Sequence, residues 1–181
     1  LVALQTQHPQ LIIQLEVAPK KRIIEGVELG SLDLGIVTPF HNRDQFDSEV
    51  LGEEALSLVL PVAHAKTKNL AETLQKLGLI HHPDVAHYLN LYFSGIQLNA
   101  LANSQVSDFP KSGYINQLSQ ILLPVAQGIG FTVLPTSALR HFPYPEKLWA
   151  ENQGQRVSEK LFSLTKRHRQ LPARYEVVRN C

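Results

Sequence analysis

The stretch GSLDLGIVTPF, residues 30–40, predicts a buried strand that ends in a turn carrying a hydroxyl group. Apolar side chains alternate with acidic or small ones over residues 32–36, and this two-residue period is typical of a strand. Proline lacks a backbone N–H and disfavours helix in the residue before it, so we expect the strand to stop at Thr38-Pro39. Ligands of open α/β sheets bind beyond the carboxyl ends of strands, which makes Thr38 a candidate ligand contact. The simpler interpretation is a turn-forming Thr-Pro pair.

The residues upstream predict a compact strand–helix–strand unit. LIIQLEV (11–17) alternates apolar and polar side chains and is typical of a strand. KKRIIEGVEL (20–29) places apolar residues on one helical face, and Gly30 follows where a helix C-cap is expected. The pattern of residues 11–37 therefore predicts a βαβ unit, which favours a parallel sheet with a right-handed crossover.

Strands and helices alternate along the rest of the chain, which predicts the α/β class. LVALQTQH is typical of the end of a helix closed by Pro9, whereas residues 143–155 give no clear pattern. Further strands are expected at residues 55–61, 79–80, 104–109, 130–135 and 161–167; further helices are expected at residues 69–78 with Asn69 as cap, 84–95, 114–128 and 172–178.

Composition excludes several classes of protein. The chain has 181 residues, 44% of them hydrophobic, which suffices for one domain or two small lobes. Its 17 Lys and Arg balance 16 Asp and Glu, so no overall positive field favours nucleic acid. The single cysteine, Cys181, allows no disulfide within the chain and fits a reducing compartment. No apolar stretch approaches the roughly 18 residues of a membrane span, and no signal peptide is visible. The chain lacks methionine and opens within a helical pattern, which suggests a fragment.

Four stretches, in order, resemble the effector-binding domain of LysR-type bacterial transcriptional regulators. GVELGSLDLGIV resembles the family's leucine- and aspartate-containing strand, and EEALSLVLPVAHA resembles its next strand and proline exit. LLPVAQGIGFTVLP resembles the family's glycine-x-glycine signature, and RQLPARYEVV resembles its closing loop and last helix. Each piece is modest alone, whereas their order and spacing along nearly the whole chain are fairly specific.

The resemblance implies a two-lobed fold of the type 2 periplasmic-binding-protein class with two crossover strands and a ligand cleft between the lobes. Lobe I would comprise residues 1–61 plus 163–181, and lobe II residues 62–162. Family members usually carry one more strand before LVALQTQHP, and an N-terminal helix-turn-helix domain that binds DNA. Both are missing from this sequence, so contact with DNA is expected only through the missing domain. The resemblance also implies a cytoplasmic protein without membrane contact.

The resemblance places effector contacts at two turns. Thr38, with Pro39 beside it, matches a ligand-contacting position that is often threonine. SGYINQ (112–117) opens an expected helix whose free N–H groups and positive dipole end suit an anion. Asn116 there matches a ligand-contacting position, with Tyr114 and Ile115 beside it. An ordinary capped helix start is the alternative.

Three further residues are candidates for the cleft. Phe131 and Thr132 would form part of its wall, although core packing is an equally good interpretation of Phe131. His81 follows a short strand, where an imidazole could bind an anionic effector. A structural or surface role is the plainer interpretation of that histidine. His82 beside it points the other way in an extended chain, so we expect no metal site there.

QGIG (127–130) invites a comparison with phosphate-binding loops. A dinucleotide fingerprint requires strand, glycines and then helix, whereas here the helix precedes the glycines. Gly128 is therefore better explained as a helix C-cap, and no nucleotide or other cofactor is expected.

The leading hypothesis is a small-molecule sensing module of a transcriptional regulator. A small, anionic effector would bind between the lobes and bias the geometry of a homodimer or tetramer on DNA. The resemblance also implies a homodimer in which LIIQLEV and the first-lobe helix pair with residues 104–109 and 114–127 of the partner. The alternative is a periplasmic solute-binding protein of a transporter, which shares the fold. An enzyme on the same architecture is the third class, but no catalytic constellation is evident.

Overall fold

The computed structural model describes residues 1–41, 43–96, 100–151, 157–172 and 175 of the chain. They form two compact units. Unit 1 comprises residues 1–52 and 160–181, and unit 2 comprises residues 53–159. The chain passes from one unit to the other within two strands, β2 (Phe46–Pro61) and β7 (Ser158–Lys166). The boundaries expected from the sequence lay somewhat further along these same two strands.

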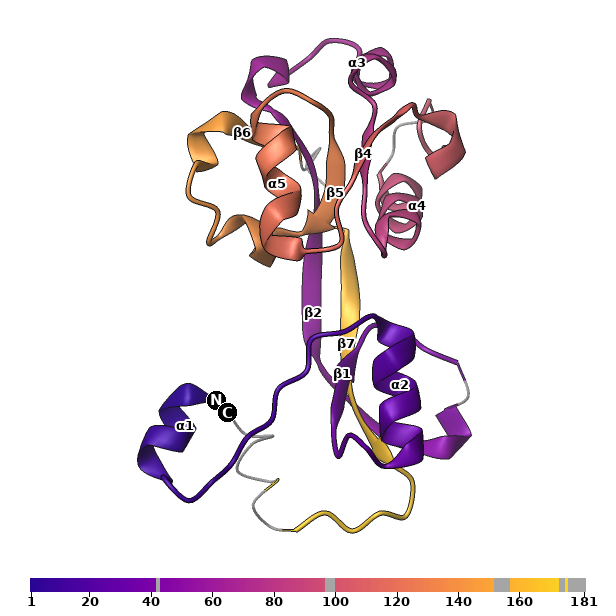
Figure 1. The fold of residues 1–181 in the computed structure, drawn as a ribbon. Coiled ribbons are helices and arrows are strands. Elements are labelled where there is room, and N and C mark those ends of the chain that lie inside the picture. Colours follow the sequence, from indigo (N-terminus) through magenta and orange to yellow (C-terminus); the bar gives the residue numbers. More distant parts are fainter. Residues whose placement is uncertain (42, 97–99, 152–156, 173–174, 176–181) are drawn as a thin grey trace. The chain divides into compact units, whose positions relative to one another are not determined.

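Unit 1 is a small sheet covered by one helix. β1 (Gly35–Val37) pairs antiparallel with β7, and α2 (Lys20–Leu29) packs on this sheet (Figure 1). The core consists of apolar side chains from these elements, from the segment after β1 and from the start of β2, namely Ile23, Val27, Val37, Phe40, Phe46, Phe162 and Leu164. Gly30 ends α2 in the left-handed conformation, as its position in the sequence predicts.

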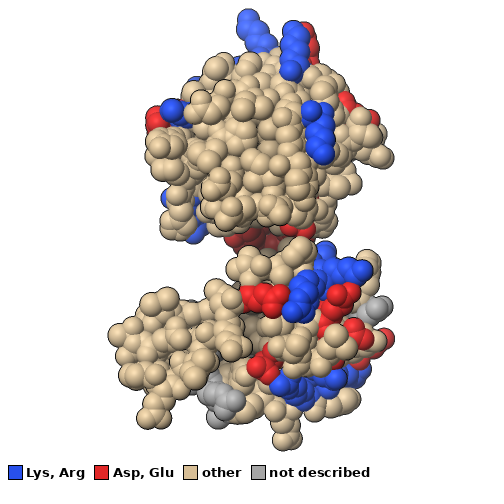
Figure 2. All heavy atoms as spheres, viewed as in Figure 1, with Lys and Arg blue, Asp and Glu red and all other residues tan. Residues whose placement is uncertain are grey.

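The surface of α2 carries both signs of charge. Figure 2 shows Lys and Arg side chains next to Asp and Glu over this part of unit 1. Lys21 pairs with Glu25 at 3.7 Å, and Arg22 pairs with Glu16 at 3.2 Å. The positive charges are therefore offset locally, and the patch does not form the basic stripe of a nucleic-acid-binding surface.

The prediction of a strand at residues 11–17 is wrong. This segment follows α1 (Val2–Gln7) and is assigned to no strand, with Ile12, Leu15 and Val17 between 74% and 92% exposed. A strand is stabilised by hydrogen bonds to a neighbouring strand and by burial of one face. No described strand pairs with this segment. The βαβ unit is consequently not formed, and β1 lies in an antiparallel pair instead.

Unit 2 is a three-layer α/β arrangement. β2 pairs antiparallel with β5 (Thr132–Pro135) and with β6 (Leu148–Glu151), while β3 (Leu79–His81) pairs parallel with β4 (Lys111–Tyr114). Helices α3 (Leu70–Leu77) and α4 (Val85–Gly95) pack on one face, and α5 (Leu118–Ala126) packs on the other. Figure 1 shows α4 and α5 on opposite sides of β5.

Side-chain alternation on β2 produces these two layers. Leu56, Leu58 and Leu60 enter the cluster with α3 and α4, whereas Val59 faces the cluster around α5. Pro61 ends β2, and Asn69 caps α3 by accepting a hydrogen bond of 3.2 Å from the Glu72 N–H, both as the sequence predicts.

Two expectations for unit 2 are wrong in detail. Residues 106–108 form a 3-10 turn with a capping box at Gln105 rather than a strand. The helix expected at 114–128 begins only at Leu118, because residues 111–114 form a strand that pairs with β3. The sequence of this strand has no alternation of apolar and polar residues, so it was not predicted. β6 lies in the stretch that the sequence leaves unspecified. The helix expected at 172–178 falls almost entirely outside the described residues.

In the part of the chain that the structure describes, no helix is long and apolar enough to cross a membrane.

Candidate functional site

In unit 2 the sequence-predicted site residues meet where two parallel strands end. His81 and Tyr114 are partners in the parallel register of β3 and β4, so both strands deliver their last side chains to one edge. The Ile115 N–H donates a hydrogen bond of 2.9 Å to the His81 carbonyl, which extends the pairing by one residue. Such an edge, beyond the carboxyl ends of the strands, is where α/β sheets bind ligands.

His81 carries an unsatisfied polar atom at this edge. Its Nε2 is buried and has no hydrogen-bond partner among the described residues. Burial lowers the pKa of His81, and the positive charge of Lys111 lowers it further, so the ring is neutral at pH 7. Leaving a buried polar atom unpaired costs about 1–3 kcal/mol, and a ligand atom that pairs with it would recover that cost.

Polar groups on the next residues suit an anion. Asn116 is exposed and lies two residues before α5, whose first N–H groups have no partner within the helix. The Lys111 ammonium lies 5.5 Å from the centre of the Tyr114 ring, a cation–π distance. The sequence pattern did not single out Lys111, because its strand went unrecognised.

Phe131 and Thr132 are placed in the interior of unit 2. Neither has exposed surface, and Phe131 packs edge-on against Phe109 with ring centres 5.1 Å apart. The Thr132 hydroxyl donates a hydrogen bond of 3.2 Å to the Ile80 carbonyl, one residue before His81. Both residues therefore support the strand that carries His81.

The QGIG turn is a helix C-cap, as predicted. Gly128 has a φ of +80° just after α5. The Gly128 N–H bonds to the Val125 carbonyl at 3.0 Å, and the Ile129 N–H bonds to the Pro124 carbonyl at 3.0 Å. This pair of bonds is the Schellman motif, so these amides are used to close a helix.

In unit 1, Thr38 lies directly beyond the end of β1. It is half-buried, and Pro39 beside it is exposed. The Lys20 ammonium, at the start of α2, donates a hydrogen bond of 3.0 Å to the Pro39 carbonyl. The Lys20 ammonium and the start of α2 thus lie near the Thr38–Pro39 turn in space. Lys20 was also missed by sequence reasoning, since it is 18 residues from Thr38 along the chain.

His82 and His87 have partners within unit 2. His82 is buried, and its Nε2–H donates to the Val133 carbonyl at 3.1 Å. The His87 ring contacts the buried Glu159 carboxylate. Over the described ranges no group of three or more His, Cys, Asp or Glu residues is arranged to hold a metal ion.

Buried His82 makes the stability of the fold depend on pH. Burial lowers the pKa of His82, against smaller opposing effects of the Val133 carbonyl and Asp84. Below about pH 6.5 the unfolded chain therefore takes up a proton that folded His82 resists. We expect the free energy of unfolding to fall as the pH drops from about 7.5 to about 5.5, with a slope approaching 1.4 kcal/mol per pH unit from this residue.

Denaturant unfolding at several pH values measures this slope. His82→Gln keeps an N–H donor but cannot take up the proton, so its slope should be shallower than that of the parent chain. His141→Gln removes an exposed histidine and serves as the control. Equal slopes for the parent chain and His82→Gln would show that His82 does not titrate in this way.

The sequence matches one family model over residues 1–181, described as "LysR substrate binding domain". The comparison with curated proteins returned no match.

Solved structures match over almost the whole chain. A putative LysR family transcriptional regulator from Pseudomonas aeruginosa has a TM-score of 0.71 at 16% identity, covering 99% of this chain and 61% of its own. The OxyR2 regulatory domain from Vibrio vulnificus, a C206S mutant, has a TM-score of 0.70 at 16% identity. That match covers 99% of this chain and 82% of the OxyR2 chain. The CcmR regulatory domain from Synechocystis, in complex with 2-PG, has a TM-score of 0.77 at 13% identity. That match covers 99% of this chain and 85% of the CcmR chain. The chain thus has the two-lobed type 2 periplasmic-binding-protein-like fold of these domains, and it spans less than two thirds of the first, longer regulator.

Proposed function

Because the chain belongs to the family of LysR substrate-binding domains, we propose that it senses a small effector for a bacterial transcriptional regulator. The effector would bind better to one conformation of the domain than to another, and so shift the population of a DNA-bound oligomer. Such a shift requires only differential affinity and no reaction. A tenfold difference in affinity between the two states corresponds to about 1.4 kcal/mol.

One observation carries the proposal of a binding site. The unpaired, buried Nε2 of His81 lies at the joint carboxyl edge of β3 and β4. A native structure rarely leaves such an atom unsatisfied without a functional reason. A ligand oxygen that accepts from the Nε2–H of the neutral ring would supply the partner.

The surrounding charges favour an anionic effector. Lys111 and the free amides of α5 stand beside His81 and Asn116 in unit 2. Lys20 stands beside Thr38 and Pro39 in unit 1. We propose that a carboxylate or phosphate compound contacts His81, Tyr114, Ile115 and Asn116 in unit 2, while Phe131 and Thr132 hold the β3 edge in place from inside. Thr38 and Pro39 are proposed contacts for the same class of anion in unit 1.

The whole regulator would bind DNA through a separate domain and act in the cytoplasm. The proposal includes a homodimer or tetramer, as the family resemblance implies. Apolar side chains exposed in both units are available for such contacts, namely Val2, Ile12, Leu15, Val17, Leu118, Leu123 and Ile129. Membership of a regulatory family favours this function over a transporter's solute-binding protein, and it is not a family of enzymes.

A thermal-shift screen of the 181-residue chain tests the proposal. Acetate, succinate, citrate, benzoate and inorganic phosphate are suitable probes, with matched neutral amides as controls. A ligand at 100 times its dissociation constant adds about 2.7 kcal/mol to the stability of the native state and raises the melting temperature. We expect at least one anion to do so in the parent chain and to lose most of its effect in His81→Phe. Equal shifts in the parent chain and the variant would remove His81 from the site.

A further inference from the structure

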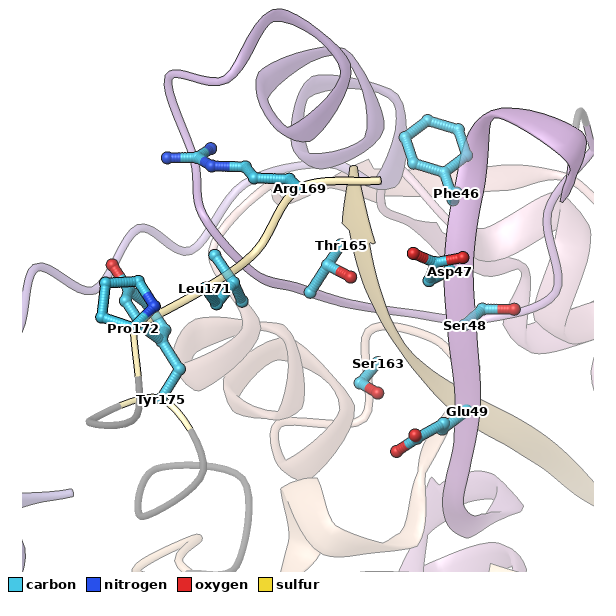
Figure 3. A pocket seen from close by; sticks show the side chains of 10 residues that line it. All are labelled: Phe46, Asp47, Ser48, Glu49, Ser163, Thr165, Arg169, Leu171, Pro172 and Tyr175. Atoms are coloured by element: carbon cyan, nitrogen blue, oxygen red, sulfur yellow. The ribbon is translucent and has the colours of Figure 1, made fainter. Parts of the chain in front are cut away.

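Unit 1 contains a pocket that shares no residue with the proposed effector site. It has a volume of about 500 Å³, within the range of sites for small ligands. Its walls come from the first part of β2, from β7 and from the segment after β7 (Figure 3). The lining residues are Phe46, Asp47, Ser48, Glu49, Ser163, Thr165, Arg169, Leu171, Pro172 and Tyr175.

The Ser163 hydroxyl lines this pocket. Ser163 is only 4% exposed, and its hydroxyl makes no hydrogen bond to another side chain or backbone group among the described residues. Neighbouring Thr165 adds a second hydroxyl from the same face of β7, because side chains two residues apart on a strand share a face. A ligand that covers this hydroxyl without a hydrogen bond would bury an unpaired polar group, so a polar ligand atom is favoured at this position.

Two carboxylates and one guanidinium group are among the described lining side chains. Asp47 and Glu49 lie two residues apart on β2, and Figure 3 shows both carboxylates on the side of β2 that faces the pocket. Asp47 forms no ion pair with any residue that the structure describes. The lining cation, Arg169, is already engaged by the carboxylate of Asp33, which also accepts a hydrogen bond of 2.7 Å from the Tyr175 hydroxyl.

The opposite wall is apolar. Leu171, Pro172 and the ring of Tyr175 line the pocket from the segment after β7 (Figure 3). A hydrocarbon chain would pack on this wall, while a charged end reaches the carboxylates. An anion is disfavoured here by Asp47 and Glu49, and a fully apolar molecule would leave Ser163 unpaired.

We propose that this pocket binds a protonated aliphatic amine. The ammonium group donates hydrogen bonds to the Asp47 carboxylate and to the Ser163 hydroxyl, and the methylene chain lies along Leu171, Pro172 and Tyr175. Because Asp47 is exposed, the ion pair is weak, and we expect a dissociation constant of roughly 0.1–5 mM at low salt.

Isothermal titration calorimetry of the 181-residue chain with 1,4-diaminobutane tests this proposal. The matched neutral probe is 1,4-butanediol, which has the same chain but no charge. We expect saturable binding of the diamine, at least tenfold weaker binding of the diol, and loss of most affinity at about 0.5 M salt. Asp47→Asn and Ser163→Ala should each weaken diamine binding about threefold to fivefold.

Glu28→Gln is the matched control, because it removes one exposed carboxylate on α2 outside the pocket. It should leave diamine binding unchanged. The proposal is overturned by equal affinity for the diol, by the absence of saturable heat, or by an equal loss of affinity in Glu28→Gln and Asp47→Asn. The last result would indicate attraction to the general surface charge.

Discussion

Replacing Phe131 with alanine is expected to lower the free energy of unfolding of unit 2 by about 3–5 kcal/mol. The ring has no exposed surface and packs in the cluster that β2, α3 and α4 share. Its removal deletes the edge-on contact with Phe109 and leaves a cavity that close-packed neighbours fill only in part. The backbone of Phe131 also bonds to Gly78 and Ile80, so relaxation around the cavity would disturb β3.

The single tryptophan reports this transition. Trp149 packs against the same cluster in unit 2, so its fluorescence during urea denaturation follows that unit. Phe131→Leu keeps most of the apolar volume and should cost only about 1 kcal/mol. Similar small losses in both variants would place the Phe131 ring outside the core, and would restore it as a wall of the effector site.

Replacing Gly78 with alanine is expected to lower the free energy of unfolding of unit 2 by roughly 3–5 kcal/mol, as much as Phe131→Ala. Gly78 joins α3 to β3 with φ +73° and ψ +165°, a backbone conformation that is essentially restricted to glycine. A Cβ there would lie 2.2 Å from the Ser112 hydroxyl and 2.7 Å from the Pro110 carbonyl oxygen. The backbone around Pro110 would have to move, which separates β4 from β3 and breaks the edge that carries His81.

Two other glycines separate backbone strain from steric overlap. Gly128 has a φ of +80° but open space around a Cβ, so Gly128→Ala should cost about 1–2 kcal/mol. Gly52 has neither constraint, and Gly52→Ala should change stability by less than about 1 kcal/mol. Urea denaturation of the three variants should give this order. Equal costs at Gly78 and Gly128 would mean that the overlap at Ser112 and Pro110 is relieved without loss.

Local signals predicted much of the fold. Gly30, Asn69 and Gly128 lie where helix caps are expected, because capping depends on a few neighbouring residues and little on the rest of the chain. Apolar periodicity likewise located α3, α4 and the last part of β2, residues 55–61. These elements carry their own pattern in the sequence.

Elements that depend on partners distant in sequence were not predicted. Residues 11–17 alternate like a strand but have no strand beside them, so the pattern alone does not form one. The reverse holds for β4, whose sequence KSGY has no alternation and which forms through its pairing with β3. Missing β4 shifted the expected start of α5 by four residues, from 114 to Leu118.

The same limitation applied to the candidate site. Strand ends and turn residues pointed to Thr38 and His81, because function in α/β proteins concentrates at such positions. Asn116 came from the family resemblance. The lysines beside them, Lys20 and Lys111, became apparent only from pairing and contacts in space. Burial of Phe131 and Thr132 likewise followed from packing, since an apolar residue after a glycine turn fits a wall and a core equally well.

A double-mutant cycle on effector binding tests the central claim most directly. The anion that gives the largest thermal shift is titrated by calorimetry into the parent chain, His81→Phe, Asn116→Ala and the double variant. If one ligand contacts both residues, each single change should weaken binding about tenfold. The affinity of the double variant should then fall by less than the product of the two single factors. Unchanged affinity in either single variant, with the native fold retained, would contradict an effector held by His81 and Asn116 together.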